Sequence, residues 1–85
     1  MSVNRNEKAE ITLDKMEPES RGKVVRVAGA GRARRRILDM GIVPSAEIEV
    51  IRRAPLGDPI EFRVKGYNLS LRKAEAKLVS VKPEV

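Results

Sequence analysis

Hydrophobic and polar positions alternate along several stretches of this 85-residue chain, and that alternation predicts short, half-buried strands. Val25 and Val27 are expected to point inward from the first stretch, and Tyr67, Leu69 and Leu71 from the fourth. The predicted strands are 22–27, 46–50 with an extension to 53, 60–64, 67–71 and 78–81.

Turn residues separate these strands. Lys65-Gly66 fits a two-residue hairpin, and two prolines and a glycine prevent a strand at 54–59. Segment 32–40 is predicted to form a short helix that ends at Gly41, with Ile42 packing back on its last turn, and 72–77 forms one helical turn.

The order of these elements predicts the fold class. About five short strands with one short α-helix and a C-terminal helical turn favour a mainly β protein. In a chain of this size they favour a small closed or nearly closed barrel. We expect residues 1–10, which are mostly polar, to be a flexible tail and residues 11–85 to be a single domain.

The predicted helix has two candidate contact faces. Ala33, Ile37 and Met40 fall within an arc of roughly 60° and should face the core. Leu38 projects roughly 100° away from Ile37, among arginines. Either the helix is gripped on two sides, or Leu38 is exposed as the apolar centre of a contact with a charged rim.

Composition limits the chemistry. The chain contains no Cys, His or Trp, so disulfides, thiolate or imidazole zinc sites, thiol nucleophiles and histidine bases are absent. One Tyr and one Phe are too few for a stacking platform. Asp14, Glu17 and Glu19 are the densest carboxylate group, but oxygen-only ligands suit Mg²⁺ or Ca²⁺ better than Fe²⁺. We expect no metal site, no cofactor and no catalysis.

The net charge of +6 is concentrated in one segment. Residues 21–36 contain seven bases and no acid, which indicates either an acidic partner or a solvated basic face. The arginines at the start of the predicted helix oppose its dipole, and an anion bound beside Gly31 would reverse that effect. The sequence pI of 10.2 also leaves a small basic barrel that binds nucleic acid as an alternative function.

Three runs together resemble one family. Residues 34–44, RRRILDMGIVP, resemble the R-L-x-x-M-G-L-x-P-G signature of FeoA proteins. Residues 54–60, APLGDPI, and 66–76, GYNLSLRKAEA, are similar to two further runs of that family, so that the resemblance spans about residues 11–82. Ser45 stands where the family usually has Gly; either Ser45 adopts a positive φ with some strain, or the turn is of another type.

The resemblance implies an SH3-like β-barrel and a role as a cytoplasmic accessory protein of ferrous iron uptake. It implies FeoB, a membrane transporter with a cytosolic GTP-binding domain, as the partner. We expect no nucleic acid, and membrane contact only through the transporter; self-association stays open. Leu56 would be either an exposed anchor or a plug of the barrel end. The candidate partner-binding residues are Arg32, Arg34, Arg35, Arg36, Leu38, Pro55, Leu56, Gly57, Asp58 and Pro59.

Overall fold

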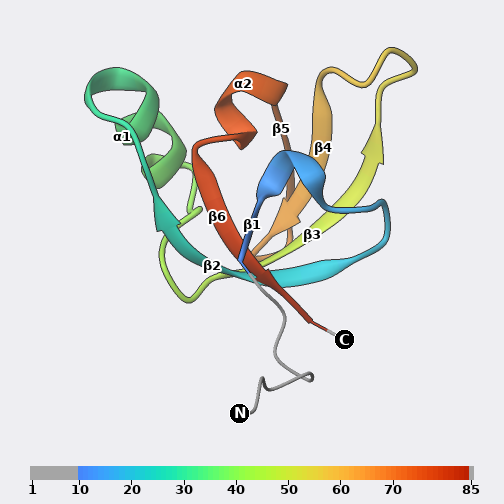
Figure 1. The fold of residues 1–85 in the computed structure, drawn as a ribbon, viewed down its shortest axis with the longest axis horizontal. Helices are drawn as coiled ribbons and strands as arrows, with labels where there is room; N and C mark the ends of the chain where they lie inside the picture. Colours follow the sequence, from blue (N-terminus) through green and yellow to red (C-terminus); the bar gives the residue numbers. More distant parts are fainter. Residues whose placement is uncertain (1–9, 85) are drawn as a thin grey trace, which may run out of the picture.

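The computed structural model describes residues 10–84, which form one strongly bent antiparallel sheet of six strands (Figure 1). The strands follow one another across the sheet in the order β1-β6-β2-β3-β4-β5. Their bounds are β1 Ile11–Thr12, β2 Arg21–Val27, β3 Glu47–Arg53, β4 Ile60–Val64, β5 Tyr67–Leu71 and β6 Val79–Pro83.

Three short helices cover the open parts of this sheet. They are the 3₁₀ helix η1 (Leu13–Lys15), α1 (Gly31–Asp39) and α2 (Lys73–Ala76). Figure 1 places α1, α2 and the loop between β3 and β4 along the same upper end of the molecule. The chain therefore gathers segments from its first half and its second half at one end of the sheet.

The concave side of the sheet holds the hydrophobic core. Phe62 is fully buried among aliphatic side chains, and η1 and α2 close the core from above with Leu13 and Ala76, both at 0% exposure. The strand residues at its centre are Val24, Val27, Ile48, Val50, Ile60, Val64, Leu71, Val79 and Val81.

The predicted ends of the helix and the hairpin are confirmed. Gly41 has a φ of 95°, and its N–H donates to Leu38 O over 3.0 Å while Ile42 N–H donates to Ile37 O over 3.3 Å. This pair of bonds is the Schellman motif, and Ile42 is fully buried behind it. Lys65 and Gly66 both have positive φ, as a type I′ hairpin turn requires.

The inward position predicted for Val25 is wrong. Val24 and Val27 are buried, and Val25 is half-buried. The register of β2 on β6 shifts between Val24 and Arg26, where Val25 is an extra residue. This bulge interrupts the two-residue period, so a strict alternation along 22–27 assigns one valine to the wrong face.

The inward strip predicted for 67–71 is correct at one end only. Leu71 is buried, Leu69 is half-buried and Tyr67 is 75% exposed. β5 lies at an edge of the sheet, so the side of the strand that begins at Tyr67 extends past the core. The alternation correctly predicted that these three side chains share one face of the strand, but it contains no information about where along the strand the core ends.

The core face predicted for the helix is also only partly correct. Ile37 is buried and Met40 is half-buried, but Ala33 is exposed. Only the second half of α1 reaches the core, and the first turn projects away from the sheet in Figure 1. A projection around the helix axis cannot detect this, because it carries no information about where along the axis the contact lies.

Of the two predicted forms, closed or nearly closed, the barrel is not the closed one. β1 and β5 are the two edges of the sheet and do not pair, so the strands form a bent open sheet in the described residues. β1 was not among the predicted strands, because two residues are too short to show an alternation. The predicted flexible tail, except for Glu10, lies outside the described residues.

Candidate functional site

The short helix α2 connects to α1 through one glutamate. Glu75 is half-buried, and its Oε1 accepts a hydrogen bond from Arg72 N–H over 2.9 Å, which satisfies a free donor at the start of α2. Its second oxygen, Oε2, forms an ion pair with Arg36 of α1. One carboxylate therefore fixes the start of α2 and holds α1 beside it.

The loop between β3 and β4, residues 54–59, is attached to α2 from its other side. Asp58 Oδ1 accepts a hydrogen bond from Lys73 N–H over 3.0 Å. The loop is also closed by its own backbone, since Ala54 N–H donates to Pro59 O over 3.0 Å and Gly57 N–H to Ala54 O over 2.7 Å. We call this segment the proline loop.

Leu56 stands at the tip of the proline loop with 95% of its surface exposed. The structure thus excludes the alternative that it folds back to plug the barrel end. Because the loop already holds this large apolar side chain in place, binding through it costs little additional conformational entropy. Pro55, Asp58 and Pro59 are exposed beside it, and Gly57 is half-buried.

The four candidate arginines of α1 are not equivalent. Arg34 Nε donates to Val27 O at the end of β2 over 3.1 Å, and Arg36 is paired with Glu75. Arg32 and Arg35 are exposed and have no ion pair with any of residues 10–84. All four arginines are exposed, but two of them also hold α1 in place.

Leu38 combines the two alternatives that its position left open. It is half-buried and packs against the core, so α1 is gripped on this side too. Its outer part lines a surface hollow of about 400 Å³ at the start of α1, together with Arg34 and Arg35. The result is a small apolar spot between guanidinium groups.

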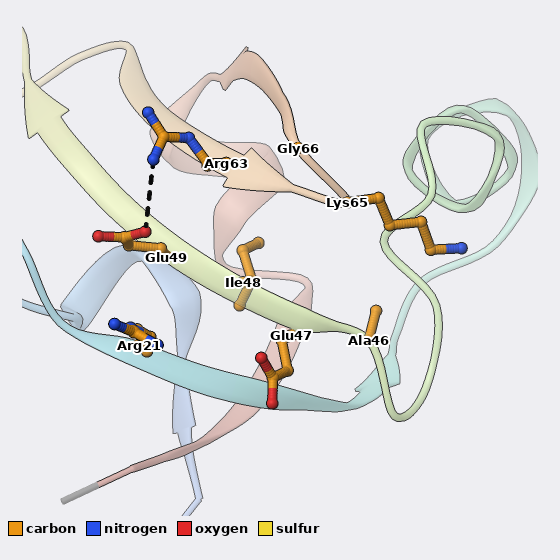
Figure 2. Close-up of a pocket in the computed structure, with 8 residues that line it drawn as sticks. All are labelled: Arg21, Ala46, Glu47, Ile48, Glu49, Arg63, Lys65 and Gly66. Carbon is orange, nitrogen blue, oxygen red and sulfur yellow. Dashed lines mark ion pairs between the residues drawn. The ribbon is translucent and has the colours of Figure 1, made fainter.

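The convex face of the sheet has a different character (Figure 2). A hollow of about 310 Å³ lies over β2, β3 and β4, and Arg63 points toward Glu49 across it with a separation of 3.9 Å. Arg21 on β2 lies opposite Glu49 in the strand register. Because opposite charges alternate here, this face lacks the one-sided positive field of a phosphate-binding surface.

Carboxylates do not gather into a metal site in the described residues. Within 10–84 there is no group of three or more acidic side chains that could hold an ion. Asp14 belongs to η1 and is only 6% exposed, whereas Glu17 and Glu19 are exposed. These three acids, close in sequence, are therefore not a metal-holding group in the described residues.

Sequence reasoning missed the part played by α2. It named α1 and the proline loop as separate candidates, and the structure connects both to one helical turn through Glu75 and Lys73. Arg72 is not one of the usual N-cap residues, so its spacing to Glu75 was a poor signal for the start of a helix, and nothing in that spacing identifies Arg36 as a second partner. We call the surface made by α1, α2 and the proline loop the docking end.

A model of the FeoA domain matches residues 11–83. The chain belongs to the FeoA family. It is 40% identical over 71 residues to the Fe(2+) transport protein A/Fe(2+) transporter FeoB fusion protein of Porphyromonas gingivalis. That alignment covers 84% of this chain and 8% of the fusion protein, so the chain spans a small part of this relative.

Solved structures of FeoA proteins share the fold. The FeoA-like protein of Clostridium acetobutylicum is 45% identical, with a TM-score of 0.84 over 89% of this chain and 88% of that one. The zinc complex of Stenotrophomonas maltophilia FeoA, an SH3 domain protein, is 27% identical, with a TM-score of 0.75 over 84% and 88% of the two chains. The predicted mainly β, SH3-like architecture is confirmed.

FeoA proteins are accessory proteins of ferrous iron transport, and this chain shares their domain over nearly its whole length. None of the helices in the described part of the chain is long and hydrophobic enough to span a bilayer.

Ser45, which replaces the usual glycine of the family, has a φ of 79°, so the turn keeps the conformation that glycine favours.

Proposed function

We propose that this protein is a non-enzymatic, cytosolic accessory subunit that docks through its docking end on the cytosolic part of a FeoB-type ferrous iron transporter. The observation that carries the proposal is Leu56, an apolar side chain 95% exposed on a braced loop at the same end as the basic helix α1. An apolar anchor and exposed charges on one surface are the usual composition of a protein-protein contact.

The fusion relative supports the choice of partner. In the Porphyromonas gingivalis protein a segment similar to this chain belongs to one polypeptide with a FeoB transporter. Covalent linkage gives two modules a high effective concentration, which favours even a weak contact between them. A separate chain of the same family would have to reach the same contact by affinity alone.

The charge of the docking end fits an acidic partner surface. α1 contains four arginines and one aspartate, and no acid lies in its first turn. Arg32 and Arg35 are available to steer association, because they pair with no carboxylate among residues 10–84. Steering by exposed charge raises the association rate and makes it sensitive to salt.

An NMR titration tests the proposal. The labelled chain is mixed with the soluble GTP-binding domain of the transporter in its GDP and GTP-analogue forms at physiological salt. We expect amide shifts in α1, in residues 55–59 and in α2, and a difference between the two nucleotide forms would indicate that nucleotide controls docking. Shifts confined to other surfaces would contradict the docking end, and no shifts in either form would contradict this domain as the partner.

A nucleic-acid titration covers the alternative function. DNA that binds with a steep loss of affinity as salt increases, and that shifts the same amides of α1, would favour a nucleic-acid-binding barrel. The alternating charges of the convex face count against that outcome. We expect no DNA binding at physiological salt.

A further inference from the structure

The strand β5 ends the sheet with one side of its backbone unused. Among residues 10–84 its sole neighbour in the sheet is β4. Edge strands with free main-chain groups pair readily with other chains unless charges, prolines or bulges block them. β5 contains none of these: its residues are Tyr67, Asn68, Leu69, Ser70 and Leu71.

The register shows which groups face outward. Val64 lies opposite Tyr67 across the two-residue turn, Phe62 opposite Leu69 and Ile60 opposite Leu71. A turn of this type places its flanking residues in a hydrogen-bonded pair, and such pairs then recur at every second residue. The N–H and C=O groups of Asn68 and Ser70 therefore point away from β4.

The residues of this edge are accessible to a second chain. Asn68 and Ser70 are exposed and Leu69 is half-buried, while Tyr67 is 75% exposed on the same side of the strand as Leu69. Leu56 and Tyr67 are the large hydrophobic side chains exposed on the described molecule, and Leu56 belongs to the docking end. Tyr67 is an apolar surface group at this edge that the docking proposal does not use.

The edge is self-complementary. If a second copy approaches antiparallel with the two-fold axis at Leu69, Asn68 of each copy lies opposite Ser70 of the other. Each of these pairs exchanges two main-chain hydrogen bonds, so all the outward groups of both residues are used. The Leu69 side chains then meet as a non-hydrogen-bonded pair, the kind in which side chains approach most closely.

Charges beside the edge are compatible with this register. Arg63 lies next to Asn68, and Glu61 lies next to Ser70, on β4. In the two-fold arrangement, a row of neighbouring residues crosses four strands: Arg63 and Asn68 of one copy, then Ser70 and Glu61 of the other. Each such row therefore ends in opposite charges, Arg63 and Glu61, about 14 Å apart, and residues 67–71 themselves contain no charge.

We propose that β5 is a self-association edge, through which two copies of this chain form a continuous antiparallel sheet about an axis at Leu69. The residues that pair in this contact, 67–71, belong to neither α1, α2 nor the proline loop. The proposal stands independently of the proposed function. The occupant of the edge is a second copy of this chain, identified by the main-chain fit of Asn68 to Ser70 about the axis at Leu69.

Single-cysteine cross-linking tests the register. The chain has no Cys, so Leu69→Cys introduces one thiol. In the proposed dimer the two residues at 69 are a non-hydrogen-bonded pair with Cα atoms about 4.5 Å apart, a separation that a disulfide spans. Under a mild oxidant such as copper-phenanthroline, we expect disulfide-linked dimers to form rapidly.

Tyr67→Cys is the matched control on the same strand and face. In the proposed dimer, position 67 of one copy faces Leu71 of the other. The two thiols at position 67 are therefore four residues apart along the strands, about 14 Å, which is too far for a disulfide. Because position 67 is more exposed than position 69, random collision would link Tyr67→Cys at least as well. We expect about tenfold more linked dimer from Leu69→Cys, because only its separation suits a disulfide.

Ser70→Pro removes the outward N–H of residue 70, which β4 does not use, so the fold should tolerate it. Added to Leu69→Cys, it should lower cross-linking to the level of Tyr67→Cys, whereas Ser70→Ala should leave it high. Circular dichroism and the melting temperature verify that each variant is folded. The same substitution should reduce the dimer fraction of the otherwise native chain in analytical ultracentrifugation.

Three results would overturn the proposal. The first is equal cross-linking at positions 67 and 69, and the second is cross-linking at 69 that Ser70→Pro leaves unchanged. The third is a chain that stays monomeric while the amides of Asn68 and Ser70 become protected on addition of the transporter's cytosolic domain. That last result would assign the edge to the transporter instead of to a second copy.

Discussion

Asp58 Oδ1 accepts the backbone N–H of Lys73 over 3.0 Å, and this contact joins two segments that are fifteen residues apart in sequence. The bond gives the start of α2 an acceptor from outside its own helix. It also holds the proline loop, so that Leu56 is presented in one position. Loop and helix therefore form one unit, and Glu75 adds α1 to it through Arg36.

The first prediction concerns this bond. Asp58→Ala should lower the free energy of unfolding by about 1 kcal/mol, because Lys73 N–H loses its acceptor. Hydrogen exchange of the Lys73 amide should become faster, and chemical denaturation measures the stability. Asp58→Asn keeps an oxygen at the same position and is the control. Equal losses in the two variants would show that charge, and not the hydrogen bond, matters here.

Because Leu56 is exposed, its truncation should change the affinity for the transporter domain and not the stability of the fold. Leu56→Ala should weaken binding to the transporter's cytosolic domain by about tenfold, the scale of a truncated interface anchor, and leave the melting temperature unchanged. Isothermal titration calorimetry and a thermal melt measure the two quantities. Tyr67→Ala removes the other exposed large side chain and should not change this affinity. A lower melting temperature with unchanged affinity for Leu56→Ala would contradict the anchor.

The arginines of α1 should divide into two classes. Arg34→Gln should destabilise the protein by about 1 kcal/mol, because Val27 O loses the guanidinium that bonds it. Arg35→Gln should leave stability within about 0.5 kcal/mol of the native chain, because the side chain is exposed and pairs with no residue of 10–84.

The association rate should show the opposite order. Arg35→Gln should slow association with the transporter domain and reduce its dependence on salt, because an exposed charge steers the encounter. Stopped-flow mixing at two salt concentrations measures the effect, with Lys82→Gln on β6 as the control for total charge. If Lys82→Gln slows association as much, the effect comes from net charge and not from α1.

The backbone conformation of Ser45 predicts that a substitution at this position can stabilise the fold. Its φ of 79° is in the left-handed region, which disfavours residues with a Cβ by about 1–2 kcal/mol. Ser45→Gly should therefore stabilise the fold by about 0.5–1 kcal/mol, after part of the gain is offset by the greater freedom of glycine in the unfolded chain. Ser45→Ala keeps the strain and should change stability little. A melting curve of the three proteins decides it.

Local chemistry determined much of the fold in advance. Gly41 and Ile42 gave the end of α1, Lys65-Gly66 gave the hairpin, and the prolines gave the loop, because backbone preferences of a few residues decide such features. The family signatures gave the SH3-like architecture. These features depend on residues that are adjacent in the chain, so sequence patterns are enough to predict them.

The candidate site was predictable in its parts but not in its assembly. The sequence by itself determined that an arginine-rich helix and a rigid proline loop exist. The tertiary structure alone decided that Leu56 is exposed, that Arg34 and Arg36 hold the helix while Arg32 and Arg35 face solvent, and that α2 joins both segments. These outcomes depend on contacts between residues far apart in the chain, whose distances no local pattern records. The bulge at Val25 and the exposed edge at Tyr67 have the same origin, because pairing across strands sets both.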